Sequence, residues 1–422
     1  MVARPNETSV HELQQGAVTE RSPDVARRLQ EALGPIVRSC VGVSTRPATL
    51  ARTLDIDRTL AARLLRALRS ADSAEMLHEI PAPGGLRIFL EAAADRGTPK
   101  PLLDAAESAV QVFEQFIDEF PGGRAALDAA LGGVNAEIRA RSARGASQAI
   151  HRSMTSLLGY QADVMLATAL IQPSADGKTL DTAYILGKCG VRRLRASSPI
   201  TVFGWRGDAT GTPPEQRRIE TIDGDLQPEL GSAYLLHDYC TRPTPPLSLY
   251  QSNDLYLYTL AESIPRVNDP VTLIGAQVVR NAGPRYQTED TRFHWETHTP
   301  RFPCKVLLAD VFVRDDALSD RMPTLTTTLH SIATGSPRPD APAFHLDDVE
   351  IDHALHQLGT GIGMAATADI PGYSAMLGSV FGRLGWDADR FRGYRCRLQY
   401  PVPLVSLTFW FDLLQDPGHH TA

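Results

Sequence analysis

The chain has few cysteines and no long apolar run, and both shortages narrow the classes of protein to consider. Its 422 residues include five scattered cysteines, none of them in a CxxC pair. Such a set favours neither a disulfide framework nor a zinc knuckle. No apolar stretch approaches the roughly 20 residues of a membrane-spanning helix, and the first residues lack the apolar segment of a secretory signal. The sequence therefore predicts a cytoplasmic protein without a membrane partner.

A strong excess of one charge is also missing. The formal net charge is −7, and 22% of the residues are charged against 43% hydrophobic, as in an ordinary folded domain. So mild an acidic excess argues against a chain that coats nucleic acid along its whole length, but it allows a local basic patch. The length predicts two or three domains.

Motifs that would commit the chain to catalysis are missing as well. No GxSxG elbow, SxxK pair or set of kinase motifs occurs. We therefore assign no catalytic residue and expect no cofactor.

Two groups of potential metal ligands are present instead. His294 and His298 are four residues apart with Glu296 between them, and on a helix such histidines could share a metal ion. The residues around them favour a polar loop. The second group consists of His345, Asp347, Asp348, Asp352, His353 and His356. We interpret it as the solvated acidic start of a helix over 347–358, so a metal-dependent enzyme is the least favoured function and no metal ligand is assigned.

Local composition divides the chain into three parts. Residues 1–21 are polar and aperiodic, and they are predicted to be a disordered lead-in. Residues 22–158 carry apolar side chains at helical spacing, and Ser22 and Pro23 form a good helix start. In residues 159–422, short segments rich in Val, Leu, Ile, Tyr and Thr alternate with turn-forming residues. The predicted class is α+β, with a helical N-terminal domain and a β-rich α+β C-terminal domain.

Three shorter stretches predict particular features. The Pro-Gly-Gly at 83–85 suits the tip of a β-wing or the start of a helix, and the alanine-rich residues that follow favour the helix. The Asp-Gly within 174–179 predicts a hairpin turn, and a helical pattern returns at 373–384. The basic stretch 191–195 could grip an anionic ligand or nucleic acid, although a solvated hairpin end is favoured.

Residues 47–70 have the pattern of two short helices joined by a tight turn, with Asp57 as N-cap of the second. Leu50, Leu54, Leu60, Leu64, Leu65 and Leu68 fall on one side of the pair, and arginines remain on the other. A recognition helix needs this division, because leucines anchor it while arginines reach phosphates and guanine edges. Residues 38–69 hold seven arginines and two aspartates, a local charge of +5. The candidate DNA-binding residues are Arg46, Arg52, Arg58, Thr59, Arg63, Arg66 and Arg69.

This pattern resembles the DNA-binding part of winged helix-turn-helix regulators of the IclR and MarR type. The residues that carry the resemblance are Thr45, Leu50, Ala51, Leu54, Ile56, Ala61, Leu64, Leu65 and Leu68. It extends over about residues 29–75, within the helical domain. Family members follow the recognition helix with a β-hairpin wing, whereas here the sequence predicts more helix. Thr59 is the only serine or threonine near the start of the second helix.

The resemblance implies a DNA-binding transcriptional regulator. Its partners would be double-stranded DNA, a small-molecule effector and further copies of the chain, with the C-terminal domain sensing the effector or forming the homo-oligomer. The alternative is a structural, assembly or protein-interaction protein that binds no DNA. Helix pairs with solvated arginines are common in proteins from GC-rich bacterial genomes, so the pattern leaves both interpretations open.

Overall fold

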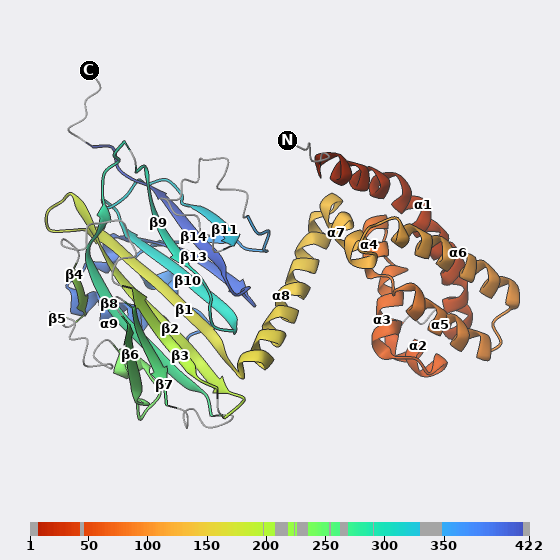
Figure 1. Cartoon of the computed structure of the whole chain (residues 1–422), viewed down its shortest axis with the longest axis horizontal. Coiled ribbons are helices and arrows are strands. Elements are labelled where there is room, and N and C mark those ends of the chain that lie inside the picture. The colour runs from red at the N-terminus through yellow and green to blue at the C-terminus, as the bar shows by residue number, and fades with distance from the viewer. Residues whose placement is uncertain are drawn as a thin grey trace, which may run out of the picture. The chain divides into compact units, whose positions relative to one another are not determined.

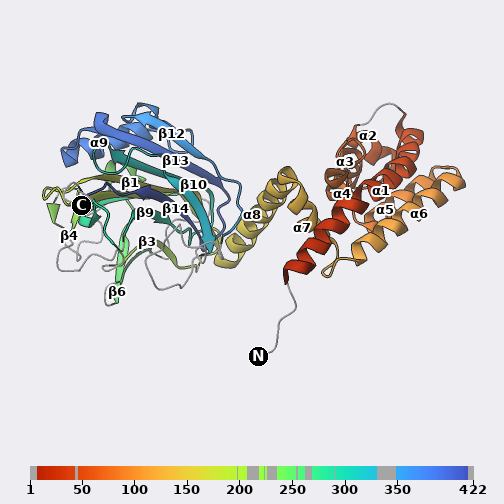
Figure 2. The same cartoon turned by 90° about the horizontal axis from the view of Figure 1, so that it is seen from above.

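The computed structural model describes residues 7–42, 46–196, 198–206, 218–222, 224–225, 235–252, 255–261, 269–289, 291–329 and 348–416. The chain divides into two compact units, Met1–Ala143 and Arg144–Ala422. The first is helical and the second is rich in strands (Figures 1 and 2). The α+β class predicted from the sequence is therefore confirmed. Over the residues described, no helix combines the length and the apolarity that crossing a membrane requires.

Helices make up the regular structure of the first unit. In chain order they are α1 (Glu7–Val41), α2 (Pro47–Leu54), α3 (Arg58–Ala67), α4 (Ser73–Glu79), α5 (Pro83–Asp95), α6 (Lys100–Asp118), α7 (Arg124–Val134) and the first part of α8 (Ala136–Leu158). Their core is aliphatic with four buried phenylalanines and includes Leu29, Leu33, Phe113 and Phe116. Residues 1–143 contain neither tryptophan nor tyrosine.

The first helix begins before the position that the sequence predicted. A disordered lead-in was expected over residues 1–21, but α1 starts at Glu7; residues 1–6 lie outside the described part of the chain. Val18 is buried, and Arg21 forms an ion pair with Glu119 and lies over the ring of Phe116. These tertiary contacts stabilise a segment whose own residues give little helical signal.

The change from helix to strand and the division into compact units fall at different residues. The change from helix to strand falls where it was expected, because α8 ends at Leu158 and β1 begins at Tyr160. The two compact units, however, divide within α8, between residues 143 and 144. The last part of this long helix therefore belongs to the β-rich unit.

The second unit is organised around an eight-stranded mixed sheet of order β12-β13-β10-β1-β2-β8-β4-β5. The central strands β1 and β10 run parallel, and the other neighbouring pairs described in this sheet are antiparallel. The strands are β1 (Tyr160–Pro173), β2 (Thr179–Arg193), β4 (Arg218–Thr221), β5 (Gly224–Asp225), β8 (Val271–Pro284), β10 (Cys304–Arg314), β12 (Leu355–Thr360) and β13 (Phe391–Gln399).

Both faces of this sheet are covered. Helix α9 (Tyr373–Leu384) packs on one face against side chains such as Leu308 and Phe312. Two three-stranded sheets cover the other face, as Figure 2 shows from above. They consist of β9 (Phe293–His298), β11 (Thr324–Leu329) and β14 (Val405–Asp412), and of β3 (Ile200–Arg206), β6 (Leu247–Ser252) and β7 (Leu255–Leu260).

Three of the local predictions for the sheet and its helices are confirmed and one is wrong. Residues 83–85 begin α5, residues 174–179 connect β1 to β2, and residues 373–384 form α9. The helix expected over 347–358 does not form in its described part. Residues 349–354 are irregular, and Leu355–Thr360 pairs with β13 as an edge strand. Backbone pairing with a strand far along the chain overrides the local helical pattern.

A buried polar network fixes α9 to the central sheet. Asp310 of β10 has no solvent-exposed surface. Arg395 of β13 donates two hydrogen bonds to its carboxylate, at 2.8 and 2.7 Å, and the Tyr373 hydroxyl donates a third at 2.9 Å. Thr168 Oγ1 lies 2.8 Å from the same hydroxyl. Every polar group in this network thus has a partner, which a buried charge requires.

Replacing Asp310 by alanine should destabilise the second unit by about 3–5 kcal/mol, because Arg395 would remain buried without its carboxylate. All four tryptophans lie within residues 144–422, so tryptophan fluorescence during urea unfolding follows this unit. Arg390→Ala is the control, since its pair with Asp315 lies at the surface, and it should change the unfolding midpoint far less. Equal midpoints for the two variants would show that the network contributes no stability.

Candidate nucleic-acid interface

The two helices predicted at 47–70 are present as α2 and α3. Asp57 is the N-cap of α3, and its carboxylate accepts hydrogen bonds from the backbone N–H groups of Thr59 at 2.7 Å and Leu60 at 3.2 Å. These bonds lower the pKa of Asp57. Asp55 ends α2 in the left-handed conformation, at φ 57°, and so makes the turn tight. The local sequence therefore specifies where α2 ends and where α3 begins.

The inner side of the helix pair packs as the leucine spacing predicted. Leu50, Leu54, Leu64 and Leu65 are buried, whereas Leu60 and Leu68 are only partly covered. The start of α5 packs close to α3, since a Cβ atom on Gly85 would lie 3.2 Å from a methyl group of Leu60.

The structure places all seven predicted DNA-binding side chains at the surface; they are Arg46, Arg52, Arg58, Thr59, Arg63, Arg66 and Arg69. Arg46 is the N-cap residue of α2 and Arg58 is the first residue of α3. The Arg52 side chain lies along its own helix, with Nε donating to the Ala48 carbonyl at 3.3 Å. Arg58 and Thr59 thus stand at the start of α3, whereas Arg63 and Arg66 lie further along it and Arg69 lies beyond its end.

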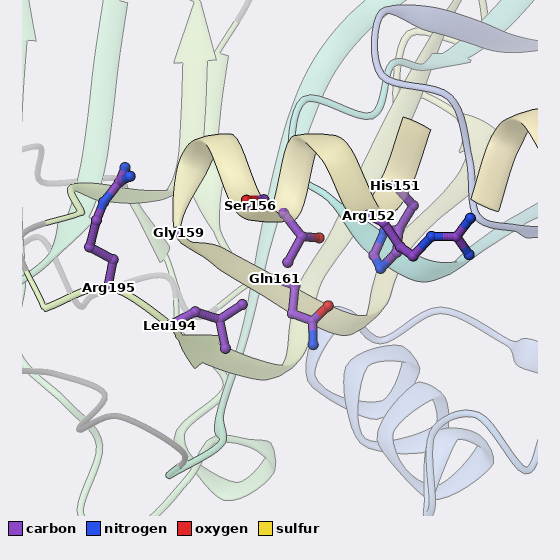
Figure 3. A pocket seen from close by; sticks show the side chains of 8 residues that line it. His151, Arg152, Ser156, Gly159, Gln161, Leu194 and Arg195 are labelled. Atoms are coloured by element: carbon purple, nitrogen blue, oxygen red, sulfur yellow. The ribbon is translucent and has the colours of Figure 1, made fainter. Parts of the chain in front are cut away.

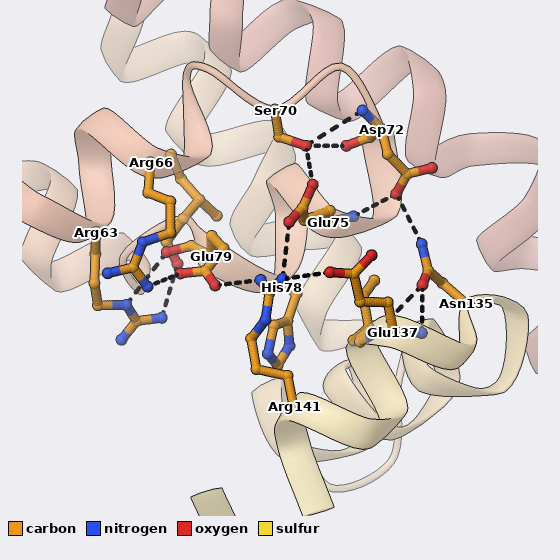
Figure 4. A network of polar contacts seen from close by, with 12 residues as sticks. Arg63, Arg66, Ser70, Asp72, Glu75, His78, Glu79, Asn135, Glu137 and Arg141 are labelled. Atoms are coloured by element: carbon orange, nitrogen blue, oxygen red, sulfur yellow. Dashed lines mark hydrogen bonds and ion pairs between the residues drawn. The ribbon is translucent and has the colours of Figure 1, made fainter. Parts of the chain in front are cut away.

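Two of these arginines also hold the fold together. Arg63 donates to the backbone carbonyls of Glu79 and Ile80, at 3.2 and 3.3 Å, at the end of α4. Arg66 donates to the Glu79 carboxylate at 2.8 Å. Figure 4 shows both guanidinium groups turned toward Glu79. The sequence pattern contained no sign of this second task.

Glu79 is the residue that the sequence reasoning missed. Its side chain is only 6% exposed, and on its other side Arg141 of α8 donates to it at 2.7 Å. Arg141 also contacts Glu75 at 3.1 Å and Glu137 at 3.3 Å (Figure 4). The hydrogen bond to Glu79 is the largest cause of the raised pKa of Arg141. Because the partners of Glu79 are 13 and 62 residues away in sequence, no local motif could identify it.

Arg63 keeps its positive charge at the surface of α3. Its acceptors are neutral carbonyl oxygens, so its charge is not compensated there. Arg66, by contrast, shares the Glu79 carboxylate with Arg141, which also pairs with Glu75 and Glu137, so that cluster has no excess of positive charge. An uncompensated charge such as that of Arg63 is what phosphate contacts need.

A wing does not follow α3. The regular elements described between residues 46 and 143 are helices, with α4 and α5 directly after α3, as the sequence predicted. Thr45, which belongs to the resemblance, lies outside the described residues. Of the features in that resemblance, the structure contains the helix pair α2 and α3.

Among the described residues of the two groups of potential metal ligands, no metal site is formed. His294, Glu296 and His298 lie on β9, a strand and not the polar loop expected, and Glu296 and His298 are buried. His294 Nε2 lies 3.0 Å from Glu296 Oε1. Across the described part of the chain, no three His, Cys, Asp or Glu side chains are placed to hold a metal ion.

In the second group, Asp352 and His353 make separate contacts. His345 and Asp347 lie outside the described residues. Asp352 lies 3.7 Å from Arg144, and His353 Nδ1 lies 2.7 Å from the Ile351 carbonyl. These contacts occupy the two side chains separately and do not direct them to one point.

Comparisons with models of protein families, with curated proteins and with solved structures found no match.

Glu79→Gln should destabilise the first unit by about 1–3 kcal/mol, because Arg66 and Arg141 would lose a buried charged acceptor. The loss of helical circular dichroism at 222 nm in urea would measure it, while the tryptophan transition of the second unit should stay in place. Glu107→Gln is the matched control, since its pair with Arg87 is at the surface. If both variants unfold at the same urea concentration, Glu79 is not a structural anchor.

Proposed function

We propose that the chain is a DNA-binding transcriptional regulator that contacts double-stranded DNA through α3. The observation that carries the proposal is the set of exposed arginines along α2 and α3, within a stretch (residues 38–69) whose local charge is +5 in a chain of −7. A helix that is anchored by leucines on one side can insert its N-terminal residues into the major groove. Arg58 and Thr59 stand at that end of α3.

In this proposal, residues at different positions along α2 and α3 make different contacts with DNA. Arg58 and Thr59 would approach base edges, and Arg46 and Arg52 would contact phosphates beside them. Arg63, Arg66 and Arg69 lie further along or beyond α3 and would add to the attraction of the backbone. Since Arg63 and Arg66 also bind Glu79 and Ile80, their contribution to DNA binding is tied to the fold.

One short helix gives limited affinity, so we further propose a homodimer that binds two half-sites about 34 Å apart, as helix-turn-helix dimers do. The β-rich unit would hold the dimer or sense a small-molecule effector. Such a regulator would act in the cytoplasm.

A protein-interaction role without DNA binding is the second candidate. The observation in its favour is that Arg63 and Arg66 are already used within the chain. In that case the remaining arginines would be a solvated or partner-binding surface.

Binding of the full chain to a random-sequence duplex, measured by fluorescence anisotropy at about 50 and 200 mM salt, decides between the two candidates. We expect affinity to fall steeply with salt. Arg58→Ala should weaken binding to any sequence and reduce the salt slope by about one if the residue contacts a phosphate. A base contact would instead relax sequence preference.

Arg96→Ala is the charge-matched control. Arg96 is the C-cap of α5, at the opposite end from Gly85, and about 16 Å of helix separates the two ends. Absence of binding at the lower salt would reject the regulator. So would equal losses for Arg58→Ala and Arg96→Ala, because the binding would then not involve α3.

A further inference from the structure

A cavity of about 430 Å³ lies in the second unit beside the end of α8. Figure 3 shows its lining: His151 and Arg152 come from α8, Gln161 from the start of β1, and Arg195 from the residues after β2. None of its eight lining residues is acidic. It shares no residue with the candidate nucleic-acid interface.

The corner that forms this cavity is sterically fixed. Gly159 ends α8 at φ +74°, and a Cβ atom there would lie 2.3 Å from Ser198 Oγ. The Gly159 carbonyl accepts hydrogen bonds from the backbone N–H groups of Leu194 at 2.8 Å and Arg195 at 3.0 Å. Only glycine fits such a position, so the chain brings the end of α8 and the end of β2 together in one geometry.

Arg195 is held at this corner by neutral partners. Its guanidinium donates to the carbonyls of Leu157 and Leu158, the last of α8, and to Ser198 Oγ, at 3.1–3.3 Å. The other arginines of the basic stretch 191–195 have separate tasks, since Arg192 pairs with Asp163 and Arg193 is buried. The solvated hairpin end that the sequence favoured is therefore wrong for Arg193, while Arg195 keeps an uncompensated charge beside the cavity.

Two buried polar atoms in the cavity wall have no protein partner. His151 is 6% exposed and Thr155 is 9% exposed, and neither His151 Nδ1 nor Thr155 Oγ1 makes a hydrogen bond with any described residue. The residues are four apart on α8, so their side chains lie on the same side of the helix. Buried polar atoms without partners are rare because they cost stability. Ten further buried side-chain atoms of the described residues also lack a partner, but these two line one cavity, where one bound molecule would serve both.

The surroundings determine which chemistry fits. The His151 ring packs against Tyr400, with centroids 5.2 Å apart. Burial lowers the pKa of His151, with Arg152 and Lys305 adding to the effect and Gln161 opposing it, so the ring is a neutral hydrogen-bonding group at pH 7. Arg152 stands at the exposed rim. The cavity thus combines two guanidinium groups with an imidazole, a hydroxyl and an amide.

We infer that this cavity binds a small organic molecule through an oxyanion group, either a phosphate or a carboxylate. Guanidinium groups suit both anions because their planar forks donate paired hydrogen bonds. Thr155 Oγ1 and His151 Nδ1 would then have an acceptor, and the volume is within the range of small-molecule sites. The inference specifies the effector part of the proposed function, but ligand binding here does not require that α3 bind DNA.

Thermal unfolding of the full chain tests the inference without any DNA. The melting temperature would be followed by tryptophan fluorescence with phosphate, acetate or chloride at constant ionic strength. A specific ligand raises the melting temperature in a saturable way, and we expect this for phosphate or acetate but not for chloride. Whichever of the two anions acts identifies the chemical group.

Three variants locate the effect. Arg152→Gln and Thr155→Val should each weaken the apparent affinity roughly ten- to hundredfold, because each removes a donor to a charged group. Thr155→Val should leave the melting temperature of the ligand-free protein unchanged or raise it, since Oγ1 has no partner to lose. Lys178→Gln is the charge-matched control, because Lys178 lies in the turn at the other end of the β1–β2 hairpin, and it should bind normally.

Three results would overturn the inference. They are a shift that does not saturate with either anion, equal affinity in all the variants, and a Thr155→Val protein that melts lower without ligand. The last result would show that the hydroxyl has a structural partner. None of these outcomes bears on DNA binding, which the anisotropy measurement tests separately.

Discussion

The arrangement of the first unit depends on one buried carboxylate. Glu79 ends α4 and is bound by Arg66 from α3 and by Arg141 from α8, so a single charge connects three helices. Burying it without partners would be prohibitive, and pairing it with two arginines makes the geometry specific. Because the same contacts orient α3, the exposed face of α3 depends on an interaction behind it. The candidate interface is thus a property of the whole helical unit and not of residues 47–70 alone.

Several arginines of this chain donate hydrogen bonds to the last carbonyl groups of a helix. Arg63 and Arg124 both donate to backbone carbonyls near the end of α4, where unpaired carbonyls and the helix dipole favour a cation. Arg195 does the same at the end of α8. Arg124 also pairs with Asp128, whereas the acceptors of Arg63 and Arg195 are neutral, so one residue can complete a helix and still attract an anion. Charge counted along the sequence therefore detects a basic region but not which members are available to a ligand.

The sequence was informative where structure is decided locally. Asp57 and the leucine spacing predicted α2 and α3, and the Asp-Gly turn predicted the β1–β2 hairpin. Sequence patterns failed where contacts between residues far apart in the chain determine the structure. The early part of α1 includes Arg21, which pairs with Glu119, and β12 forms as a strand paired with β13. The cavity near α8 needs residues 151–161 and 194–195 together, and no pattern in either stretch predicts the other. The seven exposed DNA-binding candidates were found from spacing, whereas Glu79, which binds Arg63 and Arg66, could not be.

The two polar clusters in the second unit show how a structural network differs from a binding site. Around Asp310 the donors and acceptors satisfy one another and leave no role for a ligand. Around His151 and Thr155 the backbone is equally well fixed by Gly159, but the side-chain atoms are left without protein partners. Ten other buried side-chain atoms of the described residues share this lack, but the atoms of His151 and Thr155 line one cavity and so are open to a common partner. Positive charge at the rim and the absence of acidic lining make an oxyanion the ligand class that removes the cost of leaving these atoms unpaired.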